Sequence, residues 1–228
     1  MDSKTNIGGG AFGRVSGLAA IGFAAIILLA NLLIAVPAGL PNTGADAAEV
    51  AEFFSAESGA VGLMTAFLPA AWMLAAVFGA GVFAAVRDGE RDRAEAWSLV
   101  GFAGLILQNT TITAVSAIRL ALANTGAEAA PDALWAVHDA LFTLNGAFLA
   151  LALLGLSIAG RRAGLIRPWH AVLGFAAAAL QFTSATLAAP VTAHGGALGL
   201  IGLAGWLLWV LWLVCYGLAL FKGRNASR

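Results

Sequence analysis

Residues 195–221, GGALGLIGLAGWLLWVLWLVCYGLALF, form an uncharged, strongly apolar stretch that ends at Lys222. A transmembrane helix needs about 20 predominantly apolar residues to cross about 30 Å of hydrocarbon. The stretch is long enough for that purpose and therefore predicts a membrane-spanning helix. Its length and apolarity serve as a reference for the other apolar stretches of the chain.

Five further stretches upstream are apolar over a comparable length. They cover residues 17–39, 59–86, 97–123, 133–160 and 168–190. The 228-residue chain is 61% hydrophobic and 11% charged, whereas about 25% of a soluble domain is charged. We therefore expect an all-α membrane protein with six transmembrane helices in one bundle. The bundle would occupy residues 17–221, between an N-terminal arm (1–16) and a short tail (222–228).

The charged residues are sorted by loop. All but one of the 12 Lys and Arg residues lie in the arm, the connections 87–96 and 161–167, and the tail, whereas the alternate loops carry only acidic residues. Cytoplasmic loops of membrane proteins are enriched in Lys and Arg. This pattern predicts a membrane protein with both termini in the cytoplasm. The formal net charge of zero implies no nucleic acid partner, and the expected partner is the lipid bilayer.

The first span could be a retained helix or a cleaved signal peptide. Lys4 and Arg14 precede it, and Val36-Pro37-Ala38 resembles a small-residue cleavage site. The apolar run is longer than the 7–15 residues of a signal peptide core, which favours a retained span. The loop that follows predicts a short helix to about residue 55, because Thr43 and Asp46 fit a capping box. That helix either lies at the membrane interface or covers an outward-facing site.

Several polar residues occur inside the predicted spans, and they share the outer half of the membrane. Arg119 is near the outer end of the third span, and His138 and Asp139 lie at a similar depth in the fourth. The other candidates for a ligand pocket or proton relay are Gln108, Asn145, Gln181 and Asn31. At 100° per residue, Arg119 shares a face of the third span with Gln108, Gly101 and Gly104. Small residues allow helices to approach closely, so this face should pack on a neighbouring helix.

The simplest arrangement of the charged groups is an ion pair between Arg119 and Asp139. A charged side chain near the centre of a bilayer costs at least about 2.5–3.5 kcal/mol, so these groups should turn inward and pair. The pair either orients two helices or takes part in function. His138, beside Asp139, is either a proton carrier or a histidine hydrogen-bonded between helices.

Other kinds of site receive less support. Trp72, Trp206 and Trp209 lie deep in their spans and either line an apolar cavity or pack in the core. The three His residues do not converge and show no paired metal-ligand spacing, so we expect no metal site. No motif indicates a cofactor, and the sequence identifies neither catalytic residues nor an oligomeric state.

Three stretches stand out in the second half: LWAVHDALF (134–142), RRAGLIRPW (161–169) and LVCYGLALFKG (213–223). They resemble a family of bacterial six-span membrane proteins classified only as a domain of unknown function. The resemblance implies a six-span fold in a bacterial inner membrane and brings no activity with it.

Three functions fit these observations. The first is a proton-linked transporter of a small molecule, with an anion or polar head group at Arg119 and with His138 and Asp139 as proton carriers. The second is an intramembrane isomerase or cyclase acting on a lipophilic substrate, with an uncharged Asp139 as the acid. The third is a non-catalytic scaffold, which predicts no cavity.

Overall fold

The computed structural model describes residues 10–125, 131–194 and 196–223, and every element in them is helical. The long helices are α1 (Ala11–Ala30), α4 (Ser58–Asp92), α5 (Trp97–Thr125), α6 (Pro131–Arg162), α7 (Pro168–Thr186) and α9 (Gly199–Lys222). The shorter elements are the π-helical turn η1 (Asn31–Ala35), α2 (Val36–Ala38), α3 (Ala47–Ala56), α8 (Ala188–His194) and the 3₁₀ turn η3 (Gly196–Leu198).

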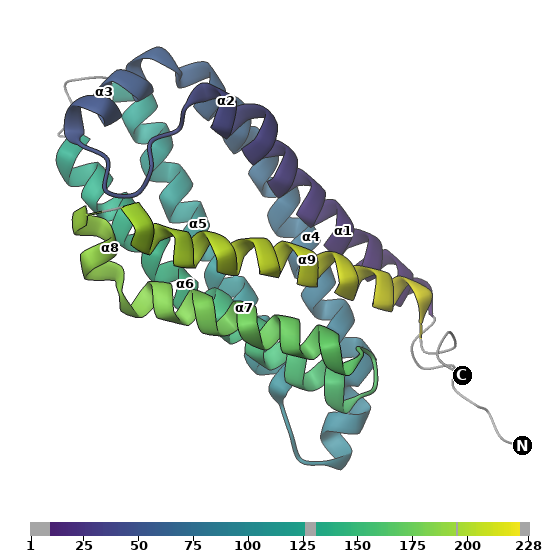
Figure 1. Ribbon diagram of the computed structural model, residues 1–228. Helices are drawn as coiled ribbons and strands as arrows, with labels where there is room; N and C mark the ends of the chain where they lie inside the picture. The colour runs from purple at the N-terminus through teal and green to yellow at the C-terminus, as the bar shows by residue number, and fades with distance from the viewer. Residues whose placement is uncertain (1–9, 126–130, 195, 224–228) are drawn as a thin grey trace, which may run out of the picture.

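The long helices of the described chain form a closed ring. Around it, α1 packs on α4, then come α5, α6, α7 and α9, and α9 packs on α1 again. Arg14 lies over the ring of Phe221, with 5.2 Å between its guanidinium carbon and the ring centroid, so the start of α1 meets the end of α9. The structure is therefore one helical bundle, as the sequence predicts (Figure 1).

The two ends of the bundle differ in charge. One end carries the α4–α5 and α6–α7 connections and the start of α1 and end of α9, with all described Lys and Arg residues except Arg119. The opposite end carries α3, α8, the end of α5 and the start of α6, with Asp46, Glu49, Glu52, Glu57 and Asp132. We name these the basic end and the acidic end.

Five of the predicted spans are helices long and apolar enough to cross a membrane. They are Ala11–Ala38, Ser58–Asp92, Trp97–Thr125, Asp132–Arg162 and Gly196–Lys222. The first begins at Ala11, inside the segment expected to be an arm. Large apolar side chains, such as Met73 (71% exposed) and Leu33 (68%), face outward on this bundle, as lipid contact requires.

The predicted fifth span, 168–190, is not one continuous helix. α7 ends at Thr186, and α8 starts after the break at Leu187. Its sequence includes His170, Gln181 and Ser184, which are all buried and which lower its apolarity. The count of six spans therefore stays a prediction, although α7 packs between α6 and α9 in the ring.

The contact between α5 and α6 depends on glycine. A Cβ on Gly101 would lie 2.6 Å from the backbone nitrogen of Leu156, and one on Gly104 would lie 2.5 Å from that of Ala152. On the other side, a Cβ on Gly155 would lie 2.4 Å from the nitrogen of Gly101. Glycine lets the two antiparallel helices approach to backbone contact, as the helical phase of the third predicted span indicates.

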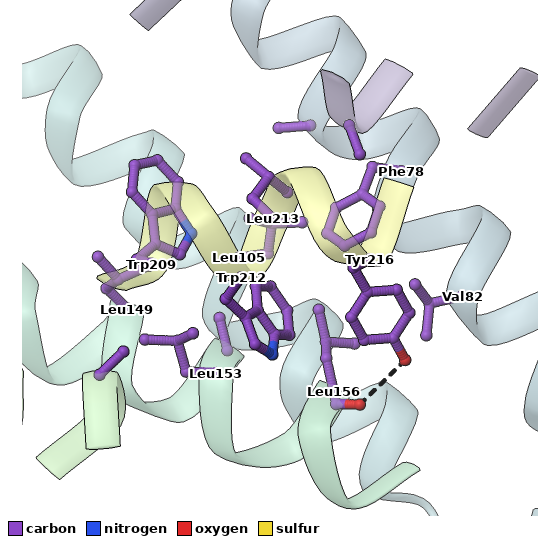
Figure 2. Close-up of a cluster of buried hydrophobic side chains, with 14 of the residues drawn as sticks. Phe78, Val82, Leu105, Leu149, Leu153, Leu156, Trp209, Trp212, Leu213 and Tyr216 are labelled. Carbon is purple, nitrogen blue, oxygen red and sulfur yellow. Dashed lines mark hydrogen bonds between the residues drawn. The ribbon is translucent and has the colours of Figure 1, made fainter. Parts of the chain in front are cut away.

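The main apolar core fills the half of the bundle nearer the basic end. Figure 2 shows its centre, where Trp212 and Tyr216 of α9 meet Phe78 of α4 and leucines of α5 and α6. The Trp212 indole donates to Ser157 Oγ (3.0 Å), and the Tyr216 hydroxyl donates to the Leu156 carbonyl (3.1 Å). The polar atoms that these aromatic side chains carry into the core are therefore satisfied.

A second, smaller apolar cluster lies at the acidic end. Its buried members are Val50, Phe53 and Phe54 of α3 together with Val61, Leu122 and Trp135. α3 is capped by Asp46, whose carboxylate accepts the Glu49 backbone N–H at 2.9 Å, so the cap lies at Asp46 rather than Thr43. The apolar face of the expected short helix is thus buried against the start of α4, the end of α5 and the start of α6.

Candidate functional site

A layer of buried polar side chains separates the two apolar clusters. On α5 and α6, these residues lie between members of the main core and members of the cluster at the acidic end, and on α7 they follow the members of the main core. The layer contains Gln108, Asn109, Ser116, His138, Asp139, Thr143, Asn145, Gln181 and Ser184. Buried polar groups need hydrogen-bond partners or ligands, so this layer is where a functional site would be expected.

Three charged or titratable side chains are hydrogen-bonded in series at the edge of this layer nearer the acidic end. Arg119 Nε on α5 donates to His138 Nε2 on α6 at 2.9 Å, and His138 Nδ1 lies 3.0 Å from Asp139 Oδ1. A guanidinium can only donate hydrogen bonds, so Nε2 accepts and Nδ1 carries the proton that reaches Asp139. The chain is therefore a guanidinium, a neutral imidazole and a carboxylate.

The expected ion pair between Arg119 and Asp139 is wrong as a direct contact. Among the described residues, no N–O distance of 4.0 Å or less joins these two side chains, and His138 lies between them. The two helices run antiparallel with Arg119 opposite His138. Asp139 is the next residue along α6 and points about 100° further around that helix. The imidazole of His138 therefore bridges Arg119 and Asp139, which the sequence predicted to be in direct contact.

Aromatic rings hold the imidazole in place. Trp135 stacks on His138 with 4.1 Å between ring centroids and 10° between planes, and Phe142 lies parallel at 6.0 Å. The Arg119 guanidinium carbon lies 6.0 Å from the Phe142 ring centroid. Since these side chains are spaced by three and four residues on α6, one face of the helix positions the whole stack.

Asp139 also holds the loop that leads into α3. Its Oδ2 accepts the backbone N–H of Gly44 at 2.7 Å, across 95 positions of sequence. Gly44 has a φ of 83°, a left-handed conformation that favours glycine. The carboxylate therefore ties the segment before α3 to the Arg119–His138–Asp139 chain.

A pocket of about 370 Å³ opens beside this carboxylate. It lies between the loop before α3, the first turns of α6 and α8. Its lining comprises Gly44, Ala45, Ala47, Asp132, Trp135, Ala136, Asp139, Thr192 and Ala193. Ligand pockets usually measure about 300–1,000 Å³, so the volume fits a small molecule.

Some buried polar atoms of the acidic half have no partner. Among the described residues, Gln108 Oε1, Asn145 Oδ1 and the Trp135 indole Nε1 are buried without a hydrogen bond. Gln108 on α5 and Asn145 on α6 both lie between the glycine contact and the Arg119–His138 bond along their helices. A buried polar atom left unpaired costs about 1–3 kcal/mol, which a function can justify.

The other predicted site residues lie elsewhere. Gln181 Nε2 donates to the Gly202 carbonyl at 3.1 Å and joins α7 to α9. Asn31 is exposed and donates to the Ile27 carbonyl of its own helix, so the structure does not place it in the polar layer. It begins the π-helical turn, and its amide satisfies the backbone on the outer face of the bundle.

The deep tryptophans pack in the main core or on its edge. Trp209 is buried and meets Phe23 edge to face at 5.7 Å, and Trp206 lies 6.3 Å from Trp209. Trp72 is half-buried on α4. The pocket at the acidic end contains none of the three.

The sequence interpretation missed four lining residues with a polar contribution. They are Trp135, Asp132, Gly44 and Thr192, and the sequence interpretation names none of them as a site residue. Trp135 had a usable signal, because it lies one helical turn before His138. Gly44 and Thr192 had none, since a loop's position over a helix depends on tertiary contacts.

In the part of the chain that the structure describes, no group of three His, Cys, Asp or Glu residues could hold a metal ion. Comparisons with protein-family models, with curated proteins and with solved structures found no match to this chain.

Proposed function

We propose that this chain is a proton-linked transporter of a small molecule, with six spans in a bacterial inner membrane and both termini cytoplasmic. The observation that carries the proposal is the pocket whose wall includes Asp139, a carboxylate that ends the chain of Arg119 and His138. A scaffold needs no such pocket. An acid catalyst needs a protonated Asp139, whereas both oxygens of this carboxylate accept hydrogen bonds.

The chain of hydrogen bonds supports a coupling to protons. If His138 gained a proton at Nε2, two N–H donors would face each other, and the bond to Arg119 would have to break. Protonation of His138 and its contact with Arg119 therefore exclude each other. The same histidine donates to Asp139, which holds Gly44 at the wall of the pocket, so a proton could change the loop that borders the ligand.

The position of α3 supports a lid rather than a free interfacial helix. Its buried residues Val50, Phe53 and Phe54 contact Trp135 and its neighbours, and Phe54 meets Trp135 at 5.9 Å. α3 and the loop before it are joined to the bundle by this apolar contact and by the Gly44–Asp139 bond. Opening them would expose the pocket wall, as lids in other proteins do.

Uptake into proteoliposomes tests the transport function. Vesicles with an imposed pH gradient are incubated with a defined mixture of amino acids, organic amines and organic acids, and their contents are measured by mass spectrometry. We expect at least one compound to accumulate with the wild type only when the gradient is present. Asp139→Asn should abolish this accumulation, and Glu52→Gln, an exposed acid on α3, serves as the matched control. Accumulation that is independent of the gradient, or equal in Asp139→Asn, would contradict the proposal.

Labelling with a membrane-impermeant maleimide tests the topology. In a Cys215→Ala background, single cysteines replace exposed residues at each end, Ser55 at the acidic end and Arg91 at the basic end. Ser55→Cys should react in intact spheroplasts, and Arg91→Cys should react only after permeabilisation. The reverse result would show that the basic end faces outward.

A further inference from the structure

We infer that the pocket at the acidic end binds a small organic ammonium ion that also carries an oxygen acceptor, such as an amino alcohol. The inference rests on the proposed function, because it names the class of molecule that the same pocket would take.

The first argument is charge. Among the described residues that line the pocket, Asp132 and Asp139 are the ionisable ones. Arg119, which the sequence suggested as an anion site, is not part of the lining, and its Nε is engaged by His138. Each carboxylate oxygen can accept two hydrogen bonds, so Asp139 keeps acceptor capacity after binding His138 and Gly44. The pocket therefore attracts a cation and repels an anion.

The second argument is the surrounding field. Asp46 and Glu49 at the start of α3 lie beside the loop that forms one wall of the pocket. At the described acidic end, Arg119 is the one basic residue, and its charge faces α6 through His138. Acidic residues clustered around a pocket raise the local concentration of cations.

The third argument separates an organic ion from a bare metal ion. The side chains of Asp132, Asp139 and Thr192 hold about five oxygens, and both oxygens of Asp139 already accept hydrogen bonds, whereas calcium takes six to eight oxygen ligands. The remaining walls are the indole of Trp135 and the methyl groups of Ala45, Ala47, Ala136 and Ala193. Such walls suit the methylene or methyl groups of an organic cation.

The fourth argument comes from Trp135 and concerns the oxygen acceptor that we expect the ligand to carry. The residue lines the pocket and is only 4% exposed, and its indole Nε1 is buried from solvent without a hydrogen-bond partner among the described residues. An indole N–H is a donor only. If the indole or the loop before α3 moved enough to open Nε1 to the pocket, a hydroxyl or carbonyl oxygen next to the ammonium group of the ligand would supply the missing acceptor.

Matched probes test each part of this inference. The full-length protein is placed in nanodiscs of phosphatidylglycerol, whose headgroup contains no amine, and binding is measured by isothermal titration calorimetry. The probes are choline, its uncharged isostere 3,3-dimethyl-1-butanol, the anion 3,3-dimethylbutyrate, and ethyltrimethylammonium, which lacks the hydroxyl. We expect choline to bind at least about tenfold more tightly than the isostere. The two molecules differ in the positive charge alone, and the quaternary ammonium, which has no N–H, is attracted to the carboxylates through that charge.

Variants locate the binding. Asp132→Asn should weaken choline binding while the protein stays folded, because Asp132 is exposed at the start of α6. Trp135→Phe should remove the preference for choline over ethyltrimethylammonium. Glu52→Gln, outside the pocket, should change neither. Thermal melting of each variant checks that it is folded.

The outcomes separate the two proposals. Equal binding of choline and its isostere, or tighter binding of the anion, would overturn the ammonium inference and leave a ligand pocket in place. Binding that is insensitive to Asp132→Asn would overturn the location. Choline binding without any gradient-dependent uptake would support the ammonium inference and contradict transport. If none of the free probes bound, and phosphatidylethanolamine added to the nanodiscs raised the melting temperature of the protein, the pocket would bind a lipid headgroup and not a free small molecule.

Discussion

In the half of the bundle nearer the basic end the buried polar groups are paired, whereas the half nearer the acidic end contains both paired and unpaired ones. In the basic half, the buried polar groups are paired within the protein. His170 bonds to the Trp212 carbonyl, and Glu90 accepts both the backbone N–H and the hydroxyl of Ser98. In the acidic half, Gln108, Asn145 and Trp135 each keep an unpaired polar atom among the described residues, and Trp135 also lines the pocket.

This difference separates stability from function. A fully satisfied polar network inside apolar packing holds helices in one arrangement. A polar layer with unpaired atoms costs stability and persists only if something else repays the cost. The comparison therefore predicts that substitutions in the basic half should lower stability, and that substitutions at the Arg119–His138–Asp139 chain should alter binding or uptake more than stability.

The largest stability effect is expected from Trp212→Ala in the basic half. Trp212 is 1% exposed and contacts Phe78, His170 and Tyr216. Its removal leaves a cavity that the ring of helices cannot fill, so the free energy of unfolding should fall by about 3 kcal/mol. Unfolding in mixed detergent micelles measures the change. Trp169→Ala, at a 55% exposed position, is the control, and an equal loss there would break the comparison.

A smaller loss is expected from Ser157→Ala. The buried Trp212 indole would lose its acceptor, and an unpaired donor of this kind costs about 1–3 kcal/mol. The same variant should show normal uptake in the proteoliposome assay, because Ser157 lies away from the pocket. Lost uptake with normal stability would show that the basic half also takes part in function.

The amides of the polar layer sharpen the comparison within the acidic half. Gln181→Leu should lower the free energy of unfolding by about 1 kcal/mol, because the bond to the Gly202 carbonyl is lost. Gln108→Leu should leave it unchanged or raise it by up to about 1 kcal/mol, because an unpaired buried oxygen is removed. Both variants are compared in the same micelle titration. A large loss in Gln108→Leu would mean that its oxygen has a partner in the membrane, such as an ordered water.

The smallest effect is expected at the surface of the basic end. Arg162 pairs with Glu95 across the α4–α5 connection and the end of α6, and its side chain is about half exposed. Exposed ion pairs contribute about 0–1 kcal/mol, and salt screens them. Arg162→Gln should therefore change the melting temperature slightly at low salt and not at all at high salt. A loss comparable to that of Ser157→Ala would show that this pair helps to hold the bundle together.

Local pattern was enough to predict much of the fold. The apolar stretches predicted helices whose observed ends lie within a few residues at most boundaries, because hydrophobic length and charged flanks are properties of each segment alone. Helical phase correctly indicated that Gly101 and Gly104 face a neighbouring helix. Depth alone did not show that Asn31 faces outward, and apolar length did not show that the predicted fifth span breaks at Leu187.

The sequence alone therefore determined that the chain forms an apolar helical bundle, that its basic residues gather at one end, and that Arg119, His138 and Asp139 lie at one level. Only the tertiary structure decided that His138 stands between the two charges, that Gly44 closes on Asp139, and that a pocket lies under the loop before α3. The physical reason is range. Hydropathy and periodicity act along one helix, whereas these contacts join residues up to 95 positions apart and depend on how helices and loops pack.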